Sequence, residues 1–385
     1  MFKNFETGAK KIGINASFFH DQPTGLAVYT YEVVKELLKI LENDVIIYTS
    51  SPSLKIKFPD KVFLITSLTS PRKKMLGHLV RFFWEQSILP FSYLKNKLSF
   101  IYNPIPEGIL FPYFNQIVTV HDIIPLLYSE IHPKMKYYYR FILPRLLKFA
   151  KFIICVSENT KKDLLKYYNT VKDKEIYVVY EGCRFNSIHY DSYFVRRRYN
   201  IEKYIFYVGD MRPYKNLERA IEAFSKLPLN DFYFVIGGKK DRNFYPKIQE
   251  KVKRLNLNRR VIFTDYIKEE ELPFFYKEAS LFIFPSLYEG FGLPPLEAMA
   301  SGCPVVVSNV ASLPEVCGDA AYYIDPYDIN SISEGIYKVL TDKNLRMTLI
   351  QKGFERVKLF TWEKTARQII EIFERTFRNE SGFGT

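Results

Sequence analysis

Short runs of β-branched and aromatic residues alternate with helical stretches along the whole of this 385-residue chain. Such alternation is typical of parallel sheets whose strands are connected by helices. It predicts strands at Ile12–Asn15, Val45–Thr49, Val62–Leu64, Phe100–Asn103, Ile117–His121, Phe152–Ser157, Ile176–Tyr180, Ile205–Val208, Phe232–Ile236, Val261–Thr264, Leu281–Pro285, Val305–Ser308 and Ala321–Ile324. The length gives room for two domains that each bury a core. We therefore predict an α/β protein with two doubly wound domains that face each other across a cleft.

Segment 181–202 separates the two series of strands. It has no apolar periodicity and contains three consecutive arginines at 196–198, so we expect a linker here. Helical patterns then close the chain at Ile329–Leu340, Leu345–Val357 and Trp362–Phe377. In open α/β sheets ligands bind beyond the carboxyl ends of the strands, so residues that directly follow strands are the candidates for function.

The composition narrows the class of protein. A net charge of +13 predicts attraction to a polyanion, which could be nucleic acid, an anionic membrane or a phosphorylated substrate. The four cysteines have neither zinc-site spacing nor the density of a disulfide scaffold, so we expect reduced thiols. The polar start MFKNFETGAKK does not have the pattern of a signal peptide, so we expect none, and no apolar run reaches the roughly 20 residues of a spanning helix. We expect a cytoplasmic protein, with attachment to a membrane surface left open.

The segment LFIFPSLYEGFGLPPLEAMASGC, residues 281–303, places Glu289 and Glu297 on either side of a turn rich in glycine and proline. Proline favours a helix start, and amides of Phe291, Gly292 and Leu293 just ahead of it can bind an anion. A carboxylate there can accept hydrogen bonds from hydroxyls. Two surface carboxylates, or the acid and nucleophile of a glycosidase, are the alternatives. The combination of phosphate amides with hydroxyl acceptors favours a sugar nucleotide.

The segment GDMRPYKN, Gly209–Asn216, follows the first strand of the second half and precedes a helical pattern at Leu217–Leu227. Arg212 and Lys215 therefore stand at a strand-to-helix turn, where side-chain cations and the helix dipole together favour a diphosphate. A solvated basic loop is the alternative. Gly237–Gly238 and residues 265–267 end the next two strands and are expected to form walls of a nucleotide pocket.

Three features of the first half also lie near predicted strand ends. Gly25 precedes the helical pattern Ala27–Leu41, and it is either a turn glycine or a point where a phosphate or acceptor approaches the backbone. His121 and Asp122 follow a strand, with Glu130 and His132 downstream as weaker candidates for acceptor contact. A lone histidine is more often structural, but this position favours a functional role. No G-x-G-x-x-G fingerprint occurs, which argues against a nicotinamide enzyme.

Two stretches combine basic and aromatic residues. Residues 134–151 (KMKYYYRFILPRLLKFAK) contain no acidic residue, and residues 72–84 (RKKMLGHLVRFFW) have the same character. They predict either amphipathic helices on an anionic membrane or ordinary helices with an aromatic face in the core. Single-stranded nucleic acid also binds such residues, but no recognised nucleic-acid module is present, and we expect no nucleic-acid partner.

Together these motifs resemble glycosyltransferase family 4, the retaining GT-B enzymes. The resemblance is nearly full length and rests on Thr24–Tyr29, His121–Pro125, Val156–Ser157, Gly209–Asn216, Glu289–Ala300 and Ser312–Pro326. The glutamate pair is its most specific part. The chain departs from the family in one place, because Tyr214 precedes Lys215 where members often carry arginine, and the arginine stands earlier, at Arg212.

The resemblance implies roles for the site residues. Glu289 would contact the donor sugar, Glu297 would hold the ribose, Lys215 with Arg212 would neutralise the leaving diphosphate, and His121 would lie beside the transferred sugar. The last helix would cross back to the N-terminal domain. This gives an acceptor domain of residues 1–186 with 362–385, and a nucleotide-sugar domain of residues 187–361.

The resemblance further implies hexose transfer to a glycan or lipid-linked acceptor of a surface polysaccharide or glycolipid. If the protein attaches to a membrane, we expect a peripheral contact on the inner face of the cell membrane. LPPLEAMA resembles mannosyltransferase and rhamnosyltransferase members, so GDP-mannose is the first expectation for the donor. We expect no cofactor and no metal, since the chain has no Asp-x-Asp. A GT-B sugar-nucleotide epimerase and a non-enzymatic basic protein that binds a membrane or nucleic acid are the alternatives.

Overall fold

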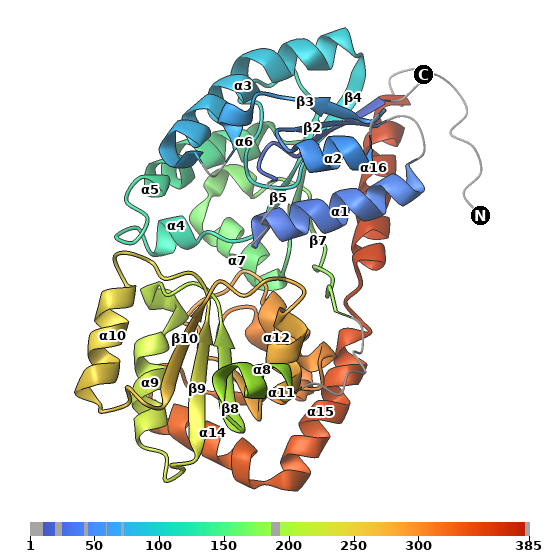
Figure 1. Cartoon of the computed structure of the whole chain (residues 1–385). Coiled ribbons are helices and arrows are strands. Elements are labelled where there is room, and N and C mark those ends of the chain that lie inside the picture. Colours follow the sequence, from blue (N-terminus) through green and yellow to red (C-terminus); the bar gives the residue numbers. More distant parts are fainter. Residues whose placement is uncertain are drawn as a thin grey trace. The chain divides into compact units, whose positions relative to one another are not determined.

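The computed structural model describes residues 11–19, 25–41, 45–58, 60–70, 73–185 and 193–381. Its internal contacts divide the chain into two compact units. Unit 1 comprises residues 1–126, 133–180 and 362–385, and unit 2 comprises residues 127–132 and 181–361. Each unit is built on its own parallel sheet, so the predicted α/β class with two doubly wound domains is confirmed (Figure 1).

The sheet of unit 1 has seven strands in the order β3-β2-β1-β4-β5-β6-β7. The strands are β1 (Lys11–Asn15), β2 (Val45–Thr49), β3 (Val62–Leu64), β4 (Leu98–Asn103), β5 (Gln116–Val120), β6 (Phe152–Cys155) and β7 (Ile176–Val178). All pairs are parallel, and Ile14 of β1 lies between Ile47 of β2 and Tyr102 of β4. The strand order reverses between β1 and β4, which makes this the switch point where open α/β sheets bind ligands.

Helices cover both faces of this sheet. They are α1 (Leu26–Ile40), α2 (Pro52–Lys57), α3 (Lys74–Lys95), α4 (Ile124–Leu127), α5 (Met135–Tyr137), the π-helical turn η3 (Tyr138–Ile142), α6 (Leu143–Phe149), α7 (Glu158–Tyr167) and α16 (Trp362–Ser381), with short 3₁₀ turns at Ser67–Thr69 and Asn169–Val171. The C-terminal helix α16 lies beside α1 (Figure 1). Phe373 and Phe377 of α16 pack on Phe100 of β4, with ring centroids 4.9 and 5.2 Å apart.

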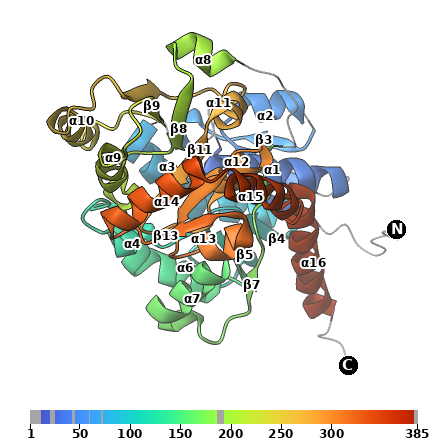
Figure 2. The ribbon, with the colours of Figure 1, turned by 90° about the horizontal axis from the view of Figure 1, so that it is seen from below.

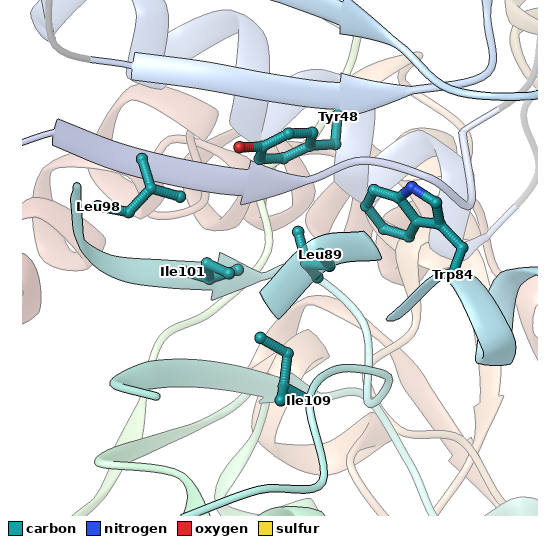
Figure 3. Packing of buried hydrophobic residues seen from close by; sticks show 6 residues of the cluster. All are labelled: Tyr48, Trp84, Leu89, Leu98, Ile101 and Ile109. Atoms are coloured by element: carbon teal, nitrogen blue, oxygen red, sulfur yellow. The ribbon is translucent and has the colours of Figure 1, made fainter. Parts of the chain in front are cut away.

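A hydrophobic cluster joins α3 to the sheet. Trp84 and Leu89 of α3 pack with Tyr48 of β2, Leu98 and Ile101 of β4, and Ile109 (Figure 3). The Tyr48 hydroxyl lies 2.8 Å from the hydroxyl of Ser92 on α3. These contacts fix which face of α3 is turned to the core.

The sheet of unit 2 has six strands in the order β10-β9-β8-β11-β12-β13. They are β8 (Lys203–Val208), β9 (Phe232–Gly237), β10 (Val261–Asp265), β11 (Leu281–Phe284), β12 (Val305–Ser308) and β13 (Tyr322–Ile324), again all parallel. The order reverses between β8 and β11. The residues that follow these two strands therefore meet at a switch point.

The helices of unit 2 are α8 (Phe194–Tyr199), α9 (Leu217–Ser225), α10 (Tyr245–Arg254), α11 (Leu272–Glu278), α12 (Leu293–Ala300), α13 (Leu313–Cys317), α14 (Ile329–Thr341) and α15 (Lys343–Val357), with 3₁₀ turns η5 (Pro213–Lys215) and η6 (Gly318–Ala320). Helix α9 lies beside α14, and α12 lies beside α15 (Figure 2). All predicted strands and the five predicted helices have counterparts in the structure, with boundaries that differ by a few residues.

The segment expected as a linker, residues 181–202, contains a short helix in the part that the structure describes. Residues 194–199 form α8, and its first amides are bound by a buried carboxylate. The N–H groups of Val195 and Arg196 both donate to Glu278 Oε2, at 3.1 Å. Six residues are too few to show a helical period, which is why the sequence pattern missed this helix.

Candidate functional site

The loop after β8 forms a tight turn that presents Lys215. Its 3₁₀ turn η5 is followed by Asn216, whose left-handed backbone (φ 62°) starts α9. The Asn216 amide donates to the carbonyls of Pro285 and Pro326, at 3.0 and 2.7 Å. Because Pro285 directly follows β11, this side chain ties the turn to the loop that carries Glu289. Asparagine suits both demands, since it tolerates a left-handed backbone and its amide donates hydrogen bonds.

Lys215 and Glu289 form a largely buried ion pair. Lys215 Nζ lies 2.7 Å from Glu289 Oε1 and 3.0 Å from Oε2, and the two side chains are 15% and 11% exposed. Burial lowers the pKa of the Lys215 ammonium, but the charges of Glu289 and Asp210 outweigh that effect and hold it above its ordinary value. Lys215 is therefore a fixed cation at the carboxyl edge of the sheet. Its ammonium also lies 5.4 Å from the centre of the Phe284 ring.

The loop that bears Glu289 is held from both sides. The Leu287 amide donates to the Tyr214 carbonyl at 2.7 Å, and the buried Ser312 hydroxyl is 3.0 Å from the Glu289 carbonyl and 2.7 Å from that of Phe291. Gly292 then starts α12 with φ 120°, a backbone angle that side chains rarely allow. These hydrogen bonds therefore fix the backbone of the loop at Glu289 and on both sides of it.

Helix α12 begins at Leu293, one residue earlier than the two prolines suggest. Pro294 and Pro295 lack N–H groups, so the first turn offers fewer amides to an anion than an ordinary helix start does. Phe291 is buried and its ring centroid lies 5.8 Å from that of Phe360. Side-chain cations must therefore supply more of any diphosphate binding in this unit.

Glu297 lies on α12 with a set of partners that does not include Lys215. Its Oε1 accepts hydrogen bonds from Arg184 Nε and Nη2, at 2.9 and 2.5 Å, and its Oε2 accepts one from the Tyr276 hydroxyl at 3.1 Å. Arg184 also donates to Glu269 at 3.1 Å. Burial lowers the pKa of Arg184, but the charge and hydrogen bonds of the Glu297 carboxylate outweigh this effect and raise the pKa above its ordinary value. The sequence reading missed Arg184, because it stands in the expected linker.

Replacing Glu297 by alanine is expected to destabilise unit 2 by about 3 kcal/mol, because it leaves the Arg184 guanidinium buried without its main counter-charge. Thermal or denaturant unfolding measures this loss. The matched control is Glu334→Ala, which removes an exposed carboxylate from α14 and should be nearly neutral. Equal stabilities of the two variants would contradict the pairing.

Arg212 stands at the start of the same turn as Lys215. Its guanidinium lies 3.2 Å from the Tyr214 hydroxyl, 3.5 Å from His132 Nε2 and 3.6 Å from Asp210 Oδ2. His132 therefore lies with Arg212 in unit 2, apart from His121 in unit 1. Partial burial and the positive charge of Arg212 lower the pKa of His132 to about 4, so this imidazole is neutral at pH 7.

Stability should depend on pH through His132. The unfolded histidine has a pKa of about 6.5, so between pH 6.5 and about 4 the unfolded state binds more protons and stability falls as the pH falls. We expect the drop in Tm between pH 7 and pH 4.5 to be smaller in His132→Asn than in the wild type. Identical drops would show that His132 does not carry this dependence.

The glycines expected at the pocket wall meet closely. A Cβ on Gly238 would lie 1.9 Å from the Gly209 carbonyl oxygen, and Gly238 has φ +132°. The Gly209 amide donates to Gly237 at 3.1 Å, and the Gly238 amide to Asp265 at 2.8 Å. Glycine at 238 therefore allows the backbone at the carboxyl end of β9 to approach the backbone at the carboxyl end of β8.

Unit 1 contains three of the candidates that the sequence predicts, His121, Asp122 and Gly25. His121 directly follows β5, is buried, and donates through Nε2 to the Pro104 carbonyl at 2.8 Å, while its ring lies 4.4 Å from that of Tyr29. Asp122 accepts from the Ile124 amide at 2.8 Å. Gly25 caps α1 with φ 50°, and a Cβ added there would meet open space. Thr24, beside it, lies outside the described residues.

The structure brings Lys215, Glu289 and Arg212 together at the switch point of unit 2, and it gives Glu297 a separate environment around Arg184. Within the described residues, no group of His, Cys, Asp and Glu is arranged to hold a metal ion. The described cysteines are all free thiols. What the arrangement offers chemically is a cation for phosphate beside a carboxylate for hydroxyls.

Comparison with known proteins decides the family. The family model described as Glycosyltransferase Family 4 matches residues 23–185, and the model described as Glycosyl transferases group 1 matches residues 193–356. The chain belongs to glycosyltransferase family 4. This glycosyltransferase has the two Rossmann-like parallel-sheet domains of the GT-B fold.

Relatives of this glycosyltransferase match over most of its length. O-antigen chain mannosyltransferase B of Escherichia coli is 29% identical over 91% of this chain and 96% of that protein. O-antigen chain mannosyltransferase RfbU of Salmonella typhimurium is 29% identical over 85% of this chain and 90% of that protein. Among solved structures, sucrose-phosphate synthase from Thermosynechococcus elongatus has a TM-score of 0.76 at 22% identity, covering 96% of this chain and 100% of that one. Anabaena HepE in complex with UDP-glucose has a TM-score of 0.75 at 16% identity, covering 95% and 99%.

Proposed function

We propose that this glycosyltransferase transfers a hexose, with mannose as the first candidate, from a nucleotide sugar to a glycan or lipid-linked acceptor, and that it retains the anomeric configuration. The observation that carries the proposal is the buried Lys215–Glu289 pair, 2.7 Å apart, on the two loops that flank the switch point of unit 2. The similarity to two O-antigen mannosyltransferases, over 91% and 85% of this chain, supports mannose and polysaccharide synthesis. GDP-mannose is accordingly the favoured donor.

The ion pair suggests how the donor binds. Without a donor, Glu289 neutralises Lys215. An incoming diphosphate brings negative charge for Lys215 and Arg212, and this releases Glu289 to accept hydrogen bonds from sugar hydroxyls. In this exchange the diphosphate replaces Glu289 as the counter-charge of Lys215, and the sugar hydroxyls replace the ammonium as donors to the Glu289 carboxylate. Gly209, Phe291, Gly292 and Leu293 are proposed to line the donor with their backbone.

The proposed reaction breaks the bond between the anomeric carbon and the phosphate oxygen and forms one from that carbon to the acceptor oxygen on the same face of the sugar. The acceptor proton passes to the departing phosphate oxygen. Negative charge grows on the diphosphate as the bond breaks, so Lys215 and Arg212, already in place, stabilise the transition state more than the ground state. With these cations at the phosphate, the proposal needs neither a divalent metal nor an organic cofactor.

Glu297 is proposed to hold the ribose, which requires Arg184 either to share the carboxylate or to move aside, because Arg184 already donates two hydrogen bonds to Glu297 Oε1. In unit 1, His121 is proposed to lie beside the transferred sugar, and the open backbone at Gly25 to admit the acceptor. The proposed place of action is the cytoplasmic face of the cell membrane, where the protein makes a peripheral contact with anionic lipid.

A screen of nucleotide sugars by thermal unfolding tests the donor. A ligand at about 100 times its Kd stabilises by about 2.7 kcal/mol, so the true donor should raise Tm clearly. We expect GDP-mannose to give the largest shift, and NMR of the transfer product to show the anomeric configuration of the donor. If none of the nucleotide sugars raised Tm, the proposed function would be contradicted. A product of inverted configuration would contradict the proposed stereochemistry.

A further inference from the structure

Helix α3 of unit 1 turns a continuous apolar face to the solvent. Between Leu76 and Leu94 its exposed residues are apolar except for Ser87. The large ones are Leu76, Leu79, Phe83, Ile88, Phe91 and Leu94, each more than half exposed. Spacings of three and four residues place most of them along one side of the helix, over about 27 Å at 1.5 Å per residue. A single apolar residue on a surface needs no explanation, but a contiguous patch marks an interaction site.

Two charged residues in the middle of the same helix, Arg81 and Glu85, are buried. Arg81 is fully buried and forms a two-point ion pair with Glu107, and it also donates to the Thr69 carbonyl at 2.9 Å. Glu85 is buried and accepts a hydrogen bond from Asn15 at 2.9 Å. Trp84 and Leu89 pack on the sheet (Figure 3). The inner face is thus already complete, and the outer apolar face cannot be explained by the packing of α3 in unit 1.

Two neighbouring segments extend the apolar face. The segment after β4 is tied to α3, since the Leu110 amide donates to Gln86 at 2.9 Å and the Phe114 ring lies 5.2 Å from that of Tyr93. In this segment Phe111 is 44% and Tyr113 88% exposed. On the other side, the 3₁₀ turn that packs against α3 exposes Leu68. The face is therefore broader than one helix.

The charges around this face are positive. Lys73 precedes α3, Lys95 ends it and Lys97 follows, and all three are exposed. Between residues 73 and 97 the one acidic residue is Glu85, which is buried. An apolar stripe with lysines at both ends matches a bilayer surface, where the stripe enters the acyl boundary and the lysines meet anionic headgroups. The carboxylates that would pair these lysines across a contact with a second copy of this face are absent from it.

We propose that the outward face of α3 is the surface by which this protein inserts into an anionic membrane. The helix lies in the plane of the interface, with Leu79, Phe83 and Phe91 in the acyl boundary and the terminal lysines at the headgroups. Among the described residues no helix is long and apolar enough to span a bilayer, so the contact is peripheral. Its purpose rests on the proposed function, since it brings the enzyme to a lipid-linked acceptor, whereas the contact itself does not depend on the donor.

The other stretch that the sequence singled out, residues 134–151, divides between core and surface. Leu143, Leu146 and Leu147 of α6 are buried, as an ordinary core helix requires, while Tyr137 and Phe141 are exposed. The expectation of an amphipathic membrane helix thus fits α3 better than this stretch. We therefore place the main contact on α3.

Co-sedimentation of the full-length protein with vesicles tests the proposal. One set of vesicles contains phosphatidylglycerol and phosphatidylethanolamine, and the other contains phosphatidylcholine alone. The wild type should bind the anionic set at least tenfold more tightly. The triple variant Leu79→Ser, Phe83→Ser, Phe91→Ser should lose at least a hundredfold, and Lys73→Gln with Lys95→Gln about fivefold for each lysine.

The matched control is Met347→Ser with Leu359→Ser, which removes exposed apolar side chains from unit 2 and should leave vesicle binding unchanged. The α3 triple variant should keep the wild-type Tm and the wild-type Tm shift with donor. Equal vesicle binding by wild type and triple variant would overturn the proposal. So would a wild-type dimer in light scattering that the triple variant abolishes, because the face would then bind a second copy. A failed donor screen with intact vesicle binding would overturn the proposed function alone.

Discussion

Lys215→Met is expected to lower kcat/KM for hexose transfer by about 10²–10³-fold, because it removes a cation that is already in place where negative charge grows on the leaving diphosphate. The side chain is held at 2.7 Å from Glu289 and is only 15% exposed, so it needs little rearrangement to act. Methionine keeps an apolar side chain of similar length while deleting the charge. Steady-state kinetics with the identified donor measures the effect.

The control for this variant is Lys338→Met, which deletes an exposed lysine of α14 that pairs with Asp342 at 3.2 Å. It should leave both the rate and the stability nearly unchanged, since exposed ion pairs contribute little. If Lys215→Met kept more than a tenth of the wild-type kcat/KM while folded, Lys215 would not be the phosphate cation.

Glu289→Gln is expected to separate sugar binding from phosphate binding. Transfer should fall by about 10²-fold, because the amide is uncharged and a poorer acceptor for the sugar hydroxyls. Affinity for the free nucleoside diphosphate should stay the same or rise, since Lys215 no longer has a carboxylate that competes with phosphate. Isothermal titration with the diphosphate and transfer kinetics measure the two effects on the same variant.

Glu355→Gln is the matched control, because it changes an exposed glutamate that pairs with Lys358 at 2.8 Å. Weaker diphosphate binding by Glu289→Gln, without a loss of transfer, would reverse the assignment and place Glu289 on the phosphate side.

The fold was largely predictable because each strand carries a local signal. Runs such as Val45–Thr49 and Val305–Ser308 are apolar and β-branched, as parallel strands buried on both faces must be. The position of Lys215 at the switch point of unit 2 follows from the same rule, since it lies just after β8. Local pattern and chain order were sufficient for this part of the site.

Long-range pairing was not predictable in the same way. Arg184 and Glu297 are 113 positions apart, and nothing in the sequence around Arg184 indicates a buried partner. Helix α3 shows a second limit. Its Arg81 and Glu85 are buried while most of its leucines and phenylalanines are exposed, so a rule that turns apolar residues to the core assigns the wrong faces. Only the partner Glu107 shows why the charges lie inside.

The most direct measurement of the central claim is a crystal structure with a non-hydrolysable analogue of the nucleotide sugar that gives the largest thermal shift. The account predicts diphosphate oxygens within hydrogen-bond distance of Lys215 Nζ, a sugar hydroxyl on the Glu289 carboxylate, and a Lys215–Glu289 distance longer than 2.7 Å. A diphosphate bound elsewhere, with the Lys215–Glu289 pair intact, would contradict it.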